Sequence, residues 1–217
     1  MRNLIALVLA FACLIPTVLA DGAQNAVDDY FGNVDEKPTY TDLSQVEWAR
    51  EAINYLADYG VIHDDNGAVN PKRYVTRQEF TELIVGAFGV YDSSAECRFT
   101  DVSRSSFYYP YIASAYKLGI INGVSEIEFG TQQLLSRQDM ATIIFRMAQK
   151  CGVAFDEKAE LGFGDADQID DYAKDAVSAL VGAGAVSGDE NYNFLPKNPS
   201  TFAEACKIVY YLMLKNT

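Results

Sequence analysis

The feature that most constrains this chain is an internal repeat. Three short motifs start similar segments, and they read Tyr40-Thr41-Asp42-Leu43, Phe99-Thr100-Asp101-Val102 and Phe163-Gly164-Asp165-Ala166. Each is followed by a helical pattern, a glycine, an apolar pair, a turn and a second helical pattern led by Thr or Ser. Such chains fold as tandem supersecondary units that share one core. We therefore expect repeats at 40–98, 99–162 and 163–217.

The second helix of each repeat carries an apolar stripe at helical spacing. The three stripes have the same offsets and consist of Phe80, Leu83, Ile84 and Ala87, then Met140, Ile143, Ile144 and Met147, then Ala205, Ile208, Val209 and Leu212. Two short helices cannot bury such a stripe alone, so the stripes predict an all-α fold whose units close on one another.

Each expected helix has end signals. A hydroxyl residue precedes an acid by three positions at Thr76/Glu79, Ser136/Asp139 and Thr201/Glu204, which is typical of a capping box. The Ser136/Asp139 pair is the weakest of these signals because Asp is shorter than Glu. Gly60, Gly119 and Gly184 follow the first helices, as glycines do after a helix C-terminus.

The N-terminus resembles a secretory signal. An apolar run follows Arg2, and Val18-Leu19-Ala20 is typical of a cleavage site. We expect a signal peptide at 1–20, a polar lead-in at 21–39, export, and no membrane span after cleavage. The mature chain keeps Cys97, Cys151 and Cys206. An odd number in an exported protein implies at least one free thiol or an intermolecular bond. We expect three buried thiols, with Cys97 and Cys151 as a candidate disulfide pair.

Charge and motif content exclude several functions. The formal net charge is −13, so the chain lacks the basic surface that nucleic acids or anionic membranes require. It has one histidine and no zinc spacing, phosphate loop or nucleophile motif. We expect no catalysis, cofactor or metal.

Arg77 and Arg137 occupy the first turn of their helices, where the helix dipole disfavours a cation. Each arginine therefore either reaches a structural carboxylate or presents its charge to an anion. The sequence leaves both interpretations open.

Together these motifs resemble the S-layer homology (SLH) family over roughly residues 40–215. The most specific segments are Val75-Thr76-Arg77-Gln78-Glu79-Phe80 and Leu135-Ser136-Arg137-Gln138-Asp139-Met140. The resemblance implies a pseudo-threefold bundle of three modules. It also implies inter-module grooves that bind secondary cell-wall polysaccharide, often pyruvylated, and so tether exported proteins to the wall.

The resemblance also implies site residues: a lead aspartate, an aromatic residue, a second glycine and the motif arginine. They are Asp42, Trp48 and Arg77 in repeat 1, Asp101, Phe107, Gly123 and Arg137 in repeat 2, and Asp165, Tyr172 and Gly188 in repeat 3. Repeat 1 has Asp64 in place of the glycine, and repeat 3 has Phe202 in place of the arginine. Taken repeat by repeat, this predicts one good groove, one doubtful groove and one mainly structural groove.

Each site residue also has a structural interpretation. The aspartates could cap helices, Trp48 and Phe107 could fill the core, and Gly123 and Gly188 could serve turns with positive φ. The expected function is wall attachment through a secondary cell-wall polysaccharide or peptidoglycan-linked glycan. The alternative is a structural envelope subunit that keeps the fold and binds a protein partner.

Overall fold

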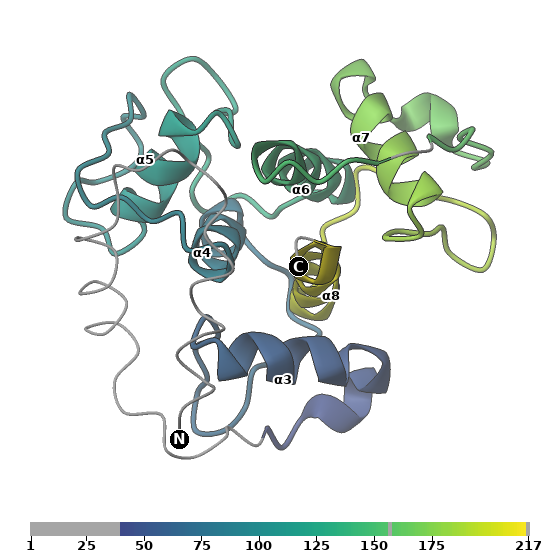
Figure 1. Cartoon of the computed structure of the whole chain (residues 1–217), viewed down its shortest axis with the longest axis horizontal. Coiled ribbons are helices and arrows are strands. Elements are labelled where there is room, and N and C mark those ends of the chain that lie inside the picture. Colours follow the sequence, from purple (N-terminus) through teal and green to yellow (C-terminus); the bar gives the residue numbers. More distant parts are fainter. Residues whose placement is uncertain (1–39, 156–157, 216–217) are drawn as a thin grey trace.

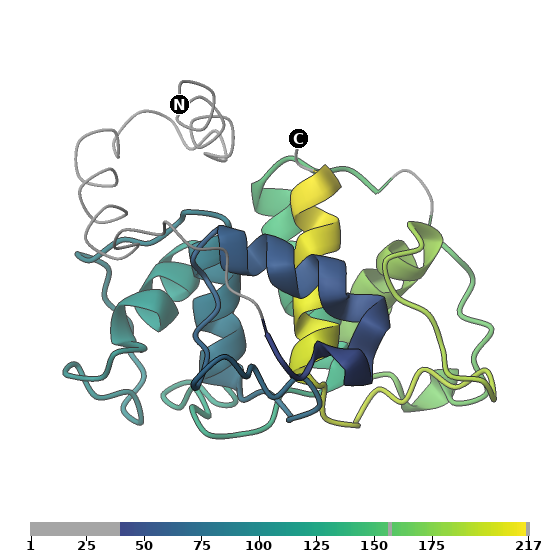
Figure 2. The same ribbon diagram turned by 90° about the horizontal axis from the view of Figure 1, so that it is seen from below.

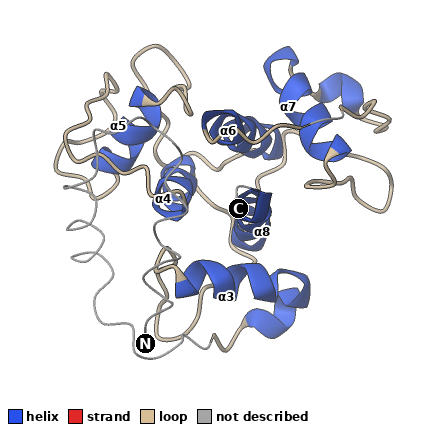
Figure 3. Ribbon diagram, viewed as in Figure 1, coloured by secondary structure: helices blue, strands red, loops and turns tan. Residues whose placement is uncertain are grey.

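The computed structural model describes residues 40–155 and 158–215. The predicted signal peptide and lead-in lie outside these residues. The elements in chain order are η1 (Leu43–Ala49), α3 (Arg50–Asp58), α4 (Arg77–Ala87), α5 (Tyr109–Lys117), α6 (Arg137–Lys150), η2 (Ala166–Gln168), α7 (Asp171–Gly182) and α8 (Phe202–Lys215). Within the described residues there are helices and isolated bridges but no strands, which confirms the all-α class (Figure 3).

The second helices of the three repeats form the centre of the molecule. Figure 1 shows α4, α6 and α8 end-on in the middle, with α3, α5 and α7 around them. Each central helix packs against the first helix of the next repeat: α4 against α5, α6 against α7, and α8 against α3. The last repeat thus contacts the first. This is the order that a pseudo-threefold bundle requires, although the symmetry itself stays a prediction.

Backbone hydrogen bonds join the three repeats in a ring just before the central helices. Val75 N donates to Ser200 O at 3.0 Å, Ser200 N to Leu135 O at 2.8 Å, and Leu135 N to Val75 O at 2.9 Å. The loops that carry this ring gather at one end of the bundle (Figure 2). Because the donors are backbone N–H groups, the ring fixes the start of each central helix relative to the other two.

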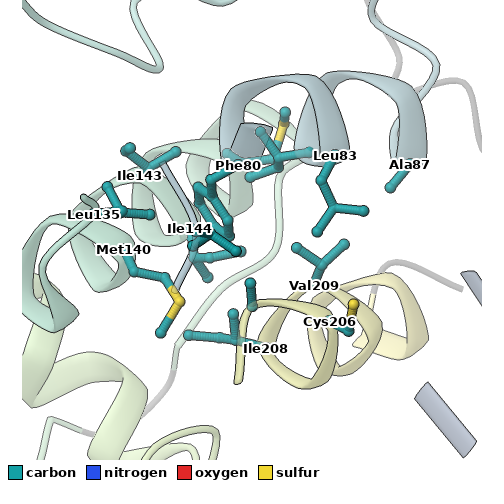
Figure 4. Close-up of a cluster of buried hydrophobic side chains, with 14 of the residues drawn as sticks. Phe80, Leu83, Ala87, Leu135, Met140, Ile143, Ile144, Cys206, Ile208 and Val209 are labelled. Carbon is teal, nitrogen blue, oxygen red and sulfur yellow. The ribbon is translucent and has the colours of Figure 1, made fainter. Parts of the chain in front are cut away.

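The predicted stripes meet in one core. Phe80, Ile144 and Val209 come from the three central helices, and each is 0% exposed. Figure 4 shows these stripe residues pointing toward one another between the helices. All other stripe residues are buried in the same cluster. Gln138 lies off the stripe, yet it is buried too, because its amide bonds the Asp170 backbone and carboxylate and the Tyr172 hydroxyl.

The helix ends follow the sequence signals. Thr76/Glu79 and Thr201/Glu204 form reciprocal capping boxes. The shorter Asp139 carboxylate accepts from the Ser136 hydroxyl and does not reach the Ser136 backbone N–H, as its length predicts. Gly60, Gly119 and Gly184 have φ values of 70°, 71° and 70°, the left-handed conformation of a residue that follows a helix.

The cysteine expectation was wrong. Cys97 is a free, partly exposed thiol, so it forms no bridge with Cys151. Cys206 alone of the three is buried with a free thiol, and burial raises its pKa.

Among the described helices, none combines the length and apolar character needed to cross a bilayer.

Candidate functional site

The three lead aspartates do not cap helices. Asp42 accepts hydrogen bonds from Val69 N (3.3 Å) and Asn70 N (2.8 Å), in the loop before α4 of its own repeat. Asp101 and Asp165 hold the corresponding loops of repeats 2 and 3. Each carboxylate therefore fixes the loop that leads into a central helix.

The pKa of Asp101 reflects this role. Burial acts to raise it, but the backbone N–H groups of Phe129, Gly130 and Thr131 favour the ionised form and bring it below its ordinary value. The helix-capping interpretation of these aspartates was wrong, because each carboxylate accepts from backbone N–H groups of a loop. Their contact with a ligand stays a prediction.

The motif arginines turn away from their own helices and enter the next repeat. Arg77 donates from Nε to Phe129 O (3.0 Å) and from Nη2 to Asn122 O (2.9 Å). Arg137 repeats this contact in repeat 3, from Nε to Phe194 O (2.9 Å) and from Nη2 to Ser187 O (3.2 Å). Of the two interpretations of these arginines, the structure therefore shows the intramolecular one in place.

Because of these contacts, the candidate residues group by junctions between repeats and not by repeat. We define the first junction by Arg77, Gly123, Asp139 and Tyr172, the second junction by Arg137, Gly188, Glu204 and Trp48, and the third junction by Phe202, Asp64, Glu79 and Phe107. In each junction the four residues come from all three repeats. The grouping of Asp101, Phe107, Gly123 and Arg137 into one groove was wrong, because Arg137 contacts the Gly188 loop while Gly123 lies beside the carbonyl bound by Arg77.

The second junction contains a groove of about 400 Å³. Trp48, Arg137, Gly188, Glu204 and Lys207 contribute to its walls. Arg137 Nη1 donates to Glu204 Oε1 at 2.6 Å, and the Lys207 ammonium lies 5.1 Å from the centre of the Trp48 ring. Asp189 also lines the groove, so an exposed aromatic ring, two cations and two carboxylates contribute to its walls.

The first junction is a tighter polar cluster. Arg77 Nη1 lies 3.7 Å from Asp139 Oδ2, and the Tyr172 hydroxyl donates to Asp139 Oδ1 at 2.8 Å. Burial lowers the pKa of both Arg77 and Arg146, while Asp139 acts to raise it. Arg146 therefore adds a second guanidinium to this junction.

The third junction has a different character. Phe202 is 7% exposed, and the Arg73 guanidinium lies 4.7 Å from the centre of its ring and bonds Glu79 at 2.8 Å. Phe202 thus fills the junction with apolar surface. His63 bonds the buried Glu82 carboxylate at 2.7 Å, and this bond raises the pKa of His63.

The three aromatic candidates are not core residues. Trp48, Phe107 and Tyr172 are each 52% exposed, so the core interpretation of Trp48 and Phe107 was wrong. Each lies at a different junction. Phe107 contacts the His63 ring at 6.1 Å between centroids, which places it at the third junction.

The second glycines are needed for space and not for positive φ. A Cβ on Gly123 would lie 2.3 Å from Glu128 O, and one on Gly188 would lie 2.9 Å from Phe163 Cε1. Neither glycine has a positive φ. Repeat 1 has Asp64 here, whose carboxylate accepts a bond from Gly67 N at 2.9 Å and so belongs to a turn.

Sequence reasoning missed Lys207 and Arg146. Neither position is the same in the three repeats, so neither belongs to the repeated motif. At the sixth position α4, α6 and α8 have Glu82, Thr142 and Lys207, and at the tenth position they have Gly86, Arg146 and Tyr211. The available signal was a basic residue five or nine residues after the motif arginine position. The described residues contain no group of three or more His, Cys, Asp or Glu side chains arranged to hold a metal.

Comparisons with known proteins agree with this architecture. The model of the S-layer homology domain matches residues 39–81, 98–141 and 162–206. The surface-layer 125 kDa protein of Lysinibacillus sphaericus is 31% identical over 155 residues, which is 70% of this chain and 13% of that protein. An amylopullulanase of Thermoanaerobacterium thermosulfurigenes is 30% identical over 180 residues, 82% of this chain and 10% of the enzyme.

A third relative is the exoglucanase XynX of Acetivibrio thermocellus, 28% identical over 187 residues, or 85% of this chain and 17% of that protein. The chain spans less than a fifth of the length of each of these relatives. Three matched segments in tandem cover more than half of the sequence. The chain therefore belongs to the S-layer homology domain family.

Proposed function

We propose that this protein attaches to the bacterial cell wall by binding an acidic secondary cell-wall polysaccharide, without chemistry, in the junctions between its repeats. The observation that carries the proposal is the groove of about 400 Å³ at the second junction. An exposed indole suits a sugar ring, and nearby cations suit a carboxylate such as that of a pyruvyl ketal. S-layer proteins among the relatives favour the same role.

The junctions are not equivalent in this proposal. The second junction is the principal site, and the first is a second site because it has two guanidinium groups against one carboxylate. The third junction does not bind. Phe202 replaces the motif arginine there and is buried, and Asp64, which replaces the glycine of repeat 1, belongs to a turn.

The location of the protein follows from the same proposal. The predicted signal peptide at 1–20 would direct export, and the bundle would hold the chain at the cell surface. The polysaccharide, or another glycan linked to peptidoglycan, is the partner, and no catalytic step is involved.

Co-sedimentation with purified cell walls tests the proposal. Protein spanning residues 21–217 is mixed with walls before and after chemical removal of the secondary polysaccharide. We expect saturable binding to intact walls that is lost after removal. Binding that survives removal, or no binding to either preparation, would contradict the proposal and favour the alternative of a structural envelope subunit.

A further inference from the structure

We propose that residues 31–39 of the lead-in pack along the seam between α8 and α3, with Phe31 against Tyr210, and so strap the last repeat to the first. This inference goes beyond the proposed function and does not depend on it. It concerns how the ring of three repeats is closed, and it follows from the way the two linkers between repeats pack.

The linker 91–98 connects α4 to α5 and packs on the helix that follows it. The Tyr91 ring centre lies 5.0 Å from that of Tyr111 on α5. Asp92 N donates to the Ser114 hydroxyl, also on α5, at 2.8 Å. The linker therefore stabilises the contact between repeats 1 and 2 through its side chains and backbone, and not only through chain connectivity.

The linker 152–162 does the same between α6 and α7. The Phe155 ring is stacked on Phe145 of α6, with centroids 5.8 Å apart. On the other side of the seam, the Ser178 hydroxyl of α7 donates to Ala159 O at 2.6 Å. The described part of this linker thus contacts both helices that it connects.

The seam between α8 and α3 closes the ring, but the chain does not connect these helices, because α3 belongs to the first repeat and α8 to the last. Three half-buried rings lie there. The Tyr55 ring centre is 4.8 Å from that of Tyr210 and 4.9 Å from that of Tyr59. Tyr210 is the ninth residue of α8, the position that Phe145 has in α6. The seam therefore offers an aromatic surface where the linker ring binds in the preceding seam.

The lead-in has an aromatic residue at the corresponding place in the sequence. Phe155 precedes the lead aromatic Phe163 by eight residues, and Phe31 precedes the lead aromatic Tyr40 by nine. Tyr40 is buried in the core at the start of repeat 1, so the segment before it begins at the bundle. Nine residues span at most about 30 Å, about twice the length of a nine-residue helix such as α3. Phe31 can therefore reach Tyr210 beside α3.

A double-mutant cycle in protein spanning residues 21–217 tests the inference through the urea unfolding midpoint. The variants are Phe31→Ala, Tyr210→Ala and the two combined. We expect Phe31→Ala to lower the midpoint, and the combined variant to lose less than the sum of the two single losses, because the rings contact each other. Phe31 lies outside the bundle, so its substitution leaves every side chain of the bundle in place.

Tyr74→Ala is the control, since Tyr74 is an exposed tyrosine of the loop before α4. Its effect should add to that of Phe31→Ala. A wild-type midpoint in Phe31→Ala, or losses that add fully for Phe31 and Tyr210, would overturn the inference. A wild-type midpoint that rises with protein concentration while Phe31→Ala has no effect would assign the seam to a second copy of this chain and would also overturn it.

Discussion

Ile144 lies at the centre of the core that the three repeats share, and its truncation measures how much that core contributes. The side chain is 0% exposed and lies between α4, α6 and α8 (Figure 4). Ile144→Ala removes three carbon groups, each worth about 0.8 kcal/mol on burial. The cavity that the substitution leaves adds to this cost, because a central helix that moved to fill it would lose its packing against the other helices around it. We expect a loss of roughly 2.5–4 kcal/mol in the free energy of unfolding.

Urea unfolding followed by circular dichroism provides the assay, with the midpoint and slope of the wild type as reference. Gln149→Ala is the matched control, since Gln149 is an exposed residue of the same helix. Gln138 would not serve, because it is buried and hydrogen-bonded to Tyr172. A loss below about 1 kcal/mol for Ile144→Ala would refute the shared core.

Three further results are expected. Phe202→Arg should lower the melting temperature and leave wall affinity unchanged, because it places a second guanidinium beside Arg73 in a buried position; higher affinity with an unchanged melt would contradict this. Asp165→Asn should cost about 1–3 kcal/mol in urea unfolding, because an amide binds two backbone N–H groups less strongly than a carboxylate, and a loss near zero would exclude the loop-holding role. Lys117 and Ser94 lower the pKa of Asp92 to about 2, so the contribution of Asp92 to stability is complete above about pH 4 and is lost as pH falls toward 2. Lys117→Gln should reduce this change in the free energy of unfolding with pH, and an unchanged dependence on pH would contradict the ion pair.

The sequence predicted the helices well because their signals are local. The stripe that contains Ile144 and the capping pair Thr76/Glu79 each lie within one helix, so spacing alone identifies them. The length of Asp139 even predicted its incomplete capping box. The packing of α8 against α3 follows only from the closure of the chain on itself, which no local pattern encodes.

The site could be predicted only as a set of residues. Trp48 and Arg137 are far apart in sequence and in different repeats, yet both line the groove at the second junction. Their meeting depends on which helix packs beside which. The role of Asp42 was also inaccessible, because its partners lie 27 and 28 residues away in a loop with no distinctive sequence.

The most direct test of the central claim compares two aromatic residues of equal exposure. Trp48 at the second junction and Phe107 at the third are both 52% exposed, so truncating either one removes a similarly placed side chain. In wall co-sedimentation, we expect Trp48→Ala to lower affinity at least about tenfold and Phe107→Ala to leave it unchanged. Equal effects of the two substitutions, or a larger effect of Phe107→Ala, would contradict the claim that this protein binds wall polysaccharide at the second junction and not at the third.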